Sequence, residues 1–233
     1  MSSQPLPPAS APGRSRLLTL LGAGALLAVL AGCATPPPPF DYTAFRASKP
    51  ASLLVLPPIN DTPDVKATPG VYATATLPLA EAGYYVLPVA VVDETFKQNG
   101  LTTPNEIAEI PLPKLREIFG ADAAVYLKVS QYGASYKVVS SETRVTVAAR
   151  IVDLRNGAQL WAGSATASSA EQSNNNQGGL VGLLVKAVIE QMVASVSDQS
   201  FNYASIANQR LLGVKANGVL PGPRARPNAA GVQ

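Results

Sequence analysis

The chain contains no histidine and a single cysteine, Cys33, among its 233 residues. The absence of histidine excludes Ser-His-Asp triads, Cys-His dyads and histidine-based zinc sites. A single cysteine excludes a disulfide within the chain, so packing must hold the fold together. Any enzymatic chemistry would have to come from carboxylates, Lys, Tyr, Ser or Thr. We therefore expect a protein without a catalytic or metal site.

The chain also lacks an apolar run of the kind that crosses a membrane. The run at residues 17–30 has 14 residues, whereas a transmembrane helix needs about 20. It follows Arg14 and Arg16, as the apolar region of a secretory signal follows its charged region. It ends in Leu30, Ala31, Gly32 and Cys33, which resemble a bacterial lipobox. Residues 1–32 are therefore expected to be a lipoprotein signal peptide.

The lipobox resemblance implies a covalent lipid anchor on Cys33. Bacterial lipoproteins carry a thioether-linked diacylglycerol and an amide-linked acyl chain on this cysteine, and we expect no other cofactor. Several acyl chains anchor a protein far more firmly than one, because each buried CH₂ contributes about 0.8 kcal/mol. Ala34 follows the cysteine in place of aspartate. This favours sorting to the outer membrane, with the domain in the periplasm.

Basic residues are few and scattered in the mature chain. Removing 32 of the 233 residues leaves 201, and the loss of Arg14 and Arg16 lowers the formal charge from +3 to +1. Binding to nucleic acid needs clustered Lys and Arg. The composition therefore argues against nucleic acid as a partner.

The mature chain divides by composition into a tether, one domain and a tail. Residues 33–50 are expected to be the lipidated cysteine and a proline-rich tether, because four prolines at 36–39 enforce an extended chain. Phe40, Tyr42 and Phe45 either pack on the domain edge or contact a partner. Residues 51–213 form a single α/β domain, and the Gly- and Pro-rich residues 214–233 a flexible tail.

Apolar patterning within 51–213 predicts a mixed β-sheet with flanking helices. Its second half is an antiparallel meander, with a hairpin signal at residues 153–157. A helix at 69–82 should stop at Gly83 and kink or break at Pro78. The other predicted helices cover 89–98, a start near 103, 113–119 and 201–212; the predicted strands cover 52–56, 84–87, 123–132, 136–139, 143–154 and 159–168.

A broad apolar helix is predicted at residues 180–196. Lys186, Glu190 and Gln191 interrupt it, which favours an amphipathic helix over a membrane span. This helix either packs on the sheet or is shared with a partner. Its candidate interface residues are Leu180, Leu183, Leu184 and Val188.

The acidic residues form no pattern typical of catalysis or metal binding. Residues 60–64 lack the spacing of a calcium-binding EF-hand loop. Asp93 and Glu94 are adjacent and would diverge by about 100° on a helix. A carboxylate-based hydrolase, the remaining enzymatic alternative, would need two acids facing one cleft.

Several blocks of the chain resemble a family of bacterial lipoproteins of unknown function, typified by a neisserial antigen found by genome-based vaccine screening. Together they span about residues 40–225. The most specific are SLLVLPP at 52–58, PLAEAGYY at 78–85, VAVVDETFKQNG at 89–100 and FGAD at 119–122. Shorter ones are DL at 153–154, LW at 160–161, GSATASS at 163–169, ANQRLL at 207–212 and GPR at 222–224.

The family resemblance implies a fold similar to the amino-terminal domain of TolB and to the periplasmic domain of the curli secretion channel. It implies other envelope lipoproteins as partners, including a curli-channel-like protein, and transfers no catalytic residues. We therefore expect a non-enzymatic binding component of an envelope assembly or secretion complex. The alternative is a lipoprotein activator of a peptidoglycan enzyme. Oligomeric state stays open, and a homo-oligomer is one option.

Overall fold

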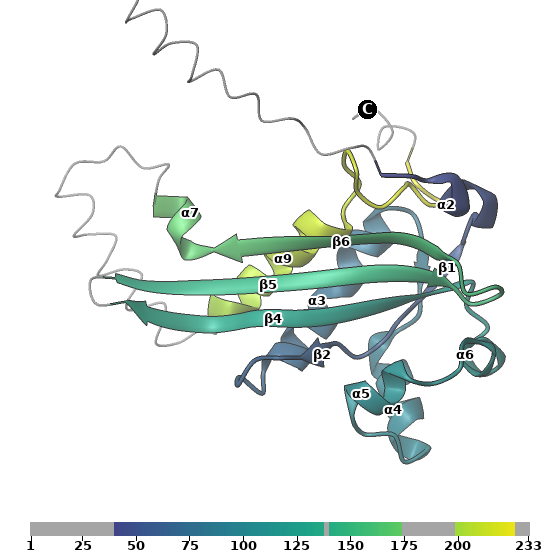
Figure 1. Cartoon of the computed structure of the whole chain (residues 1–233), viewed down its shortest axis with the longest axis horizontal. Coiled ribbons are helices and arrows are strands. Elements are labelled where there is room, and N and C mark those ends of the chain that lie inside the picture. Colours follow the sequence, from purple (N-terminus) through teal and green to yellow (C-terminus); the bar gives the residue numbers. More distant parts are fainter. Residues whose placement is uncertain (1–39, 138–139, 174–198, 227–233) are drawn as a thin grey trace, which may run out of the picture. The chain divides into compact units, whose positions relative to one another are not determined.

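The computed structural model describes residues 40–137, 140–173 and 199–226, in which a six-stranded mixed sheet has helices on both faces (Figure 1). The strand order is β3-β1-β4-β5-β6, and β2 pairs with β4 beside this path. The strands are β1 Ser52–Val55, β2 Ile59–Asn60, β3 Tyr85–Val86, β4 Ala123–Lys137, β5 Ser140–Asp153 and β6 Gln159–Ser168. The expected α/β class with a mixed, helix-flanked sheet is confirmed.

The central strand β1 is parallel to both of its neighbours, β3 and β4. Its residues Leu53, Leu54 and Val55 are all fully buried and alternate between the two faces of the sheet. A parallel strand needs a crossover connection, which usually contains a helix and covers the face that it crosses. The continuous apolar run of β1 follows from this burial on both faces.

The second half of the sheet is the predicted antiparallel meander β4-β5-β6. The expected break between 132 and 136 is wrong, because β4 is continuous through Gly133, which takes φ +113°. An irregularity between Val129 and Gln131 shifts the register instead. In the β5–β6 turn, Gly157 alone has positive φ and its N–H donates to Asp153 O.

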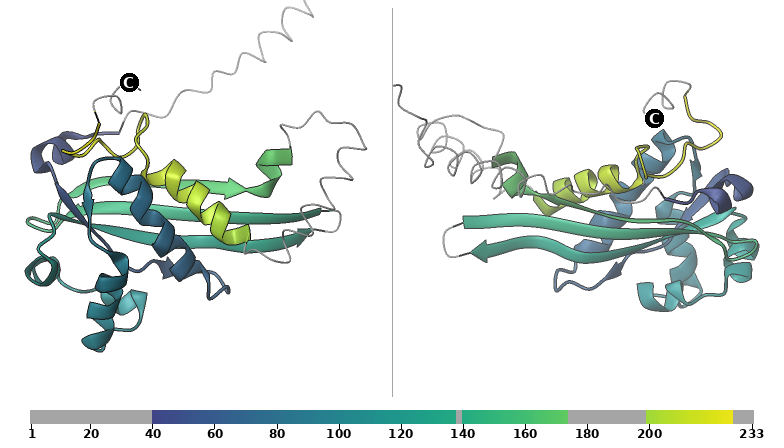
Figure 2. Two further views of the ribbon diagram at one scale, coloured as in Figure 1. Left: turned by 180° about the vertical axis from the view of Figure 1, so that it is seen from behind. Right: turned by 45° about the horizontal axis from the view of Figure 1, so that its top comes forward.

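One face of the sheet is covered by helices α3 and α9 (Figure 2). The bounds on this side are α2 Thr43–Ser48, α3 Ala67–Glu81, α7 Ser169–Ser173 and α9 Gln199–Leu212. Trp161 of β6 is buried beneath them. The predicted break at Pro78 is absent, because α3 continues through this proline to Glu81 and Pro78 is itself buried against the core, so packing outweighs the one hydrogen bond that its missing N–H would have donated.

The opposite face is covered only at one end, by α4 Val89–Gln98, α5 Pro104–Ala108 and α6 Leu112–Phe119 (Figure 2). Thr103 caps α5 by accepting a hydrogen bond from the Glu106 N–H, and Gly120 ends α6 with φ +65°. Phe96 and Leu115 fill the small core between these helices and the start of β4. The far end of the meander carries none of the described helices on this face.

The domain begins at Phe40, earlier than the expected residue 51. Phe45 is buried in the main core, and Phe40 and Tyr42 pack against that core. The Tyr42 hydroxyl donates to the Gly218 carbonyl. The second half of the expected tether is therefore part of the domain, because its aromatic side chains gain more by burial than by exposure.

The C-terminal segment, defined as residues 213–226, is folded against the domain, so the expected flexible tail is wrong over 214–226. Val219 is buried, and the Trp161 indole donates to the Asn217 carbonyl. The Gly222 N–H donates to Ala82 O and the Arg224 N–H to Gly83 O. These backbone hydrogen bonds to the α3–β3 turn hold a Gly- and Pro-rich sequence that has little secondary structure of its own.

An ion pair fastens α2 to the β5–β6 turn. Asp153 has a fully buried side chain, and the Arg155 guanidinium lies 2.6 Å from its Oδ2. The Ser48 hydroxyl of α2 donates to the same carboxylate at 2.7 Å. Burial alone would raise the pKa of Asp153, but the hydrogen bonds from Arg155 and Ser48 outweigh it and lower the pKa to about 2.

Replacing Arg155 with methionine is expected to lower the free energy of unfolding at pH 7 by roughly 2 kcal/mol, because a buried carboxylate loses its charged partner. A lowered folded-state pKa stabilises the fold above the unfolded pKa of about 3.9 and loses that effect as the pH falls toward 2. The difference in the free energy of unfolding between wild type and Arg155→Met, measured by urea titration, should therefore become smaller as the pH falls from about 4 to 2. A difference in the free energy of unfolding that does not change with pH would contradict a stabilising role for the Asp153–Arg155 ion pair.

Candidate functional site

The uncovered part of the meander forms a polar surface, here called the polar sheet face. It consists of outward side chains of β4, β5 and β6 on the side opposite α3 and α9. Cross-strand register arranges them in rows, because β4 and β6 both pair with β5. The rows are Arg150–Ala162, Lys128–Ala148–Ser164 and Gln131–Thr146–Thr166, and Arg144 lies beyond the last of them. Tyr126, which pairs with Arg150, is buried in the small core beside this surface.

Alternation along β5 produces this surface. Val145, Val147, Ala149 and Ile151 point into the main core. The residues between them, Arg144, Thr146, Ala148 and Arg150, therefore point to the other face. Arg150 and Ala148 are exposed. A sheet covered on one side and open on the other has this hydrophobic-in, polar-out pattern.

Arg150 is held in place by stacking on Tyr126. Its guanidinium carbon lies 3.9 Å from the centre of the tyrosine ring, well within the range of a cation–π interaction. Burial raises the pKa of Tyr126 above its ordinary value of 10.0, and the nearby Arg150 charge opposes this only in part. Tyr126 is thus neutral at pH 7, and the pair presents an ordered cation on a flat surface.

Hydrogen bonds order the next part of the surface across all three strands. The Thr146 hydroxyl donates to Gln131 Oε1 at 2.7 Å and lies 2.9 Å from the Thr166 hydroxyl. On the β4 edge, Lys128 Nζ lies 2.7 Å from Asp61 Oδ2 in the loop after β2. The polar sheet face therefore contains three locally ordered groups: Arg150 on Tyr126, the Gln131–Thr146–Thr166 hydrogen bonds and the Lys128–Asp61 ion pair.

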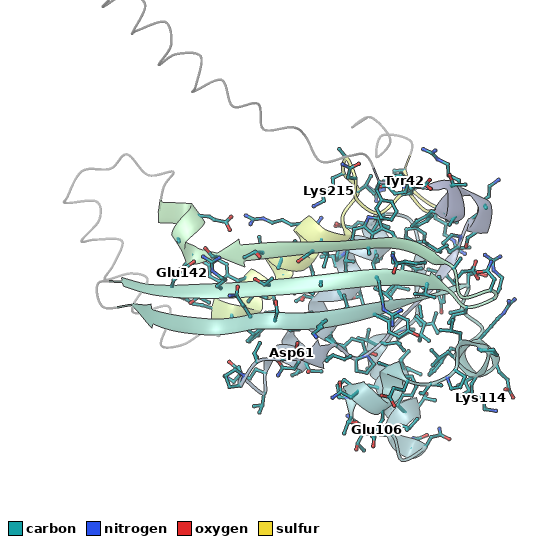
Figure 3. All side chains as sticks on the ribbon, viewed as in Figure 1. Tyr42, Asp61, Glu106, Lys114, Glu142 and Lys215 are labelled. Carbon is teal, nitrogen blue, oxygen red and sulfur yellow. The ribbon has the colours of Figure 1, made fainter. Side chains whose placement is uncertain are left out.

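A shallow depression of about 400 Å³ adjoins the polar sheet face. The loop after β2 lines one side, with Asp61, and β5 lines the other, with Glu142 and Arg144 (Figure 3). Asp61 pairs with Lys128, and Glu142 accepts from Arg144 Nε at 3.1 Å. Because each carboxylate has a basic partner, the depression resembles a polar contact surface more than a cleft with two facing acids.

Neither a metal cluster nor a spanning helix occurs in the described part of the chain. In residues 40–137, 140–173 and 199–226, no three His, Cys, Asp or Glu side chains are placed to hold a metal ion. Over the same ranges, no helix has both the length and the apolar character to cross a membrane.

The site residues predicted from sequence lie outside the described ranges. This holds for the lipobox residues Leu30, Ala31, Gly32 and Cys33, and for the candidate interface residues Leu180, Leu183, Leu184 and Val188. The acids that were considered for catalysis are on solvated helices. Asp93 pairs with Lys97, and Glu94 accepts a hydrogen bond from Gln98.

The polar sheet face was not singled out from the sequence. The signal was nevertheless present, because residues 144–151 alternate strictly between core and surface positions. Alternation alone shows that one face is open. It does not reveal that Tyr126 and Arg150, 24 residues apart, stack on each other (150 − 126 = 24), because that depends on the register between β4 and β5.

This fold is an α/β domain in which a mixed sheet has α3 and α9 packed on one face and a partly open face opposite them. The chain belongs to the GNA1162-like lipoprotein family, whose model, described as "Putative lipoprotein GNA1162-like", matches residues 40–224. The family resemblance stated from the sequence blocks is thereby confirmed.

Relatives include a lipoprotein of Neisseria meningitidis serogroup B, NMB1124/NMB1162, described as putative. It is 50% identical over 206 residues, which are 88% of this chain and 95% of the relative. The crystal structure of lipoprotein GNA1162 from N. meningitidis is 50% identical and matches with a TM-score of 0.49, covering 62% of this chain and 99% of that one. A PelC dodecamer from Paraburkholderia phytofirmans matches at 15% identity and a TM-score of 0.42, covering 70% of this chain and 86% of that one.

Proposed function

We propose that this protein is a non-enzymatic, outer-membrane-anchored binding component of an envelope assembly or secretion complex. The observation that carries the proposal is the polar sheet face, an ordered and exposed surface in a member of a lipoprotein family. Its partners would be other envelope lipoproteins, among them a curli-channel-like protein. A second copy of this chain is the other candidate occupant.

The chemistry of the polar sheet face suits a protein partner. Arginine is enriched at the energetic centres of protein interfaces, and the exposed Arg150 is held here over the ring of the buried Tyr126. Side chains fixed before binding lose little conformational entropy on binding. The Gln131–Thr146–Thr166 array adds hydrogen-bonding groups that are already in place.

The alternative, activation of a peptidoglycan enzyme, is less well supported because the tether is short. The domain begins at Phe40, so only residues 34–39 separate it from Cys33. Even fully extended, the link from residue 33 to residue 40 spans at most about 25 Å. An activator that must reach through the cell wall would need a longer tether.

A photo-crosslinking amino acid at Ala148, in the middle of the polar sheet face, tests the proposal. In intact cells it should form an adduct with an envelope lipoprotein or channel subunit, identified by mass spectrometry. Val91, which is 63% exposed on α4, is the control position and should form no such adduct. Equal adducts at both positions, or none at Ala148, would count against the proposal.

Arg150→Glu should reduce the Ala148 adduct at least about tenfold, because it reverses a charge in a surface that excludes water when bound. Arg116→Glu is the matched control, since Arg116 is exposed on α6, away from the polar sheet face. Both variants should remain folded, although Arg150→Glu should unfold a few degrees below wild type because it loses the contact with Tyr126. An unchanged adduct in Arg150→Glu would remove Arg150 from the interface.

A further inference from the structure

A second surface feature, here called the basic groove, lies between α2 and the C-terminal segment. It has a volume of about 300 Å³. Phe45, Tyr84, Leu220 and Pro223 give it an apolar lining. Tyr84 and Phe45 are core residues, and the Tyr84 hydroxyl donates to the Leu220 carbonyl, so both walls are built on the folded core.

The groove carries positive charge at its rim. Arg46 and Lys49 are among its nine lining residues, and none of the nine is acidic. Arg224 follows Pro223 directly and is exposed, with its guanidinium carbon 6.0 Å from the centre of the Tyr85 ring. The acid close to Arg46 is Asp41, whose Oδ1 accepts a hydrogen bond from the Thr43 N–H just before α2. Three cations against one carboxylate leave a local excess of positive charge.

The groove also lies at the end of the domain from which the chain leads back to Cys33. The Phe40 N–H donates to Asn217 Oδ1 and the Tyr42 hydroxyl to the Gly218 carbonyl, so the first described residues lie on the C-terminal segment. Tyr42 and Lys215 are at this same end (Figure 3). With Cys33 lipidated, residue 40 stays within about 25 Å of the bilayer surface.

We propose that the basic groove docks the domain on the anionic phospholipid surface of the membrane that holds Cys33. Arg46, Lys49 and Arg224 would bind headgroup phosphates, and the apolar lining would contact the glycerol and upper acyl region. The position of the membrane in this proposal rests on the lipid anchor of the proposed function. Phe45 and Tyr84, which line the groove, belong to the main core on the α3 and α9 side of the sheet. We therefore expect docking to leave the polar sheet face, on the other side of the sheet, directed away from the bilayer.

Co-sedimentation of the mature chain carrying Cys33→Ser with vesicles tests this without the lipid anchor. Vesicles of phosphatidylethanolamine and anionic phosphatidylglycerol should bind the protein, whereas vesicles of zwitterionic phosphatidylcholine alone should not. Arg46→Gln, Lys49→Gln and Arg224→Gln together should weaken binding about 100-fold at low salt. Added salt should weaken wild-type binding in the same way.

The control removes three basic residues from the other side of the sheet, as Lys97→Gln, Lys114→Gln and Arg116→Gln on α4 and α6. It lowers the net charge equally and should leave binding within about twofold, since these residues would not reach the surface. Equal loss in both triple variants would overturn the proposal, because the effect would then belong to net charge alone.

A second measurement tests the proposal even if the charge variants fail to fold, because it uses other substitutions. Tryptophan placed at exposed Pro223, at the groove, should be quenched by brominated lipids, whereas tryptophan at Ala148 should not. The native Trp161 is buried and supplies the same background in both. Quenching only at Ala148 would overturn the proposal. Because the chain tested has no lipid on Cys33, this outcome is separate from failure of the crosslinking at Ala148.

Discussion

Replacing Cys33 with serine, in a chain exported behind the signal peptide of a soluble periplasmic protein in place of residues 1–32, should transfer the protein from the membrane fraction to the soluble fraction almost completely. Serine cannot form the thioether to diacylglycerol or receive the acyl chain that follows it, and the exchanged signal peptide is removed without lipidation, so no apolar segment remains to hold the chain in the membrane. Each CH₂ lost from the bilayer removes about 0.8 kcal/mol of membrane affinity, so the loss of whole acyl chains exceeds any other single-residue effect expected here. Fractionation of cells followed by immunoblotting measures it.

Ala34→Asp is the matched control for this experiment. It keeps Cys33 and its lipid but should move the protein from the outer to the inner membrane in a density gradient. If Cys33→Ser remained wholly in the membrane fraction, the lipid anchor would be refuted. If Ala34→Asp stayed in the outer membrane, the anchor would stand and the sorting argument would fail. The residual affinity of Cys33→Ser for membranes should be the part that the basic groove supplies.

Gly83→Ala should have the largest effect on folding. Gly83 has φ +93°, and a Cβ there would lie 2.1 Å from the backbone nitrogen of Ala225. The backbone conformation alone costs an alanine about 1–2 kcal/mol. The overlap adds to this, because relieving it must displace the C-terminal segment from the α3–β3 turn. We expect a total loss of at least about 3 kcal/mol in the free energy of unfolding.

Gly100→Ala separates the two contributions. Gly100 has φ +78°, and nothing lies within 4 Å of the position that its Cβ would take. Urea unfolding of this variant should therefore show the conformational cost alone, about 1–2 kcal/mol. Limited trypsin digestion should also cut at Arg224 faster in Gly83→Ala and not in Gly100→Ala. Equal losses in the two variants would mean that the C-terminal segment contributes little to stability.

Local patterns in the sequence predicted most of the elements correctly. The buried run of β1, the helix stops at Gly83 and Gly120 and the meander all follow from periods of 2 and 3.6 residues and from glycines that accept positive φ. Where the expectation was wrong, tertiary contacts had outweighed local preference. Gly133 lies within a strand because β5 pairs with β4 on both sides of it.

The ends of the domain were predicted less well, and for a common reason. Proline and glycine in residues 34–50 and 214–233 predict a chain without helices or strands. The C-terminal segment indeed contains neither a helix nor a strand. It is nevertheless fixed by hydrogen bonds. Its backbone N–H groups donate to the carbonyls of Ala82 and Gly83, and one of its carbonyls accepts from the Trp161 indole. Composition reports the tendency to form helices and strands but does not report hydrogen bonds offered by distant residues.

For this protein the sequence by itself determined the class of fold and the family and predicts a lipid anchor, because a hydrophobic period, the blocks that resemble the family and a lipobox are all local in the chain. The tertiary structure alone decided which surfaces are available. The stacking of Arg150 on Tyr126 depends on strand register. The basic groove depends on the meeting of Phe45 and Leu220, which lie 175 residues apart (220 − 45 = 175). Such contacts are absent from any local pattern, since only the folded chain brings these residues together.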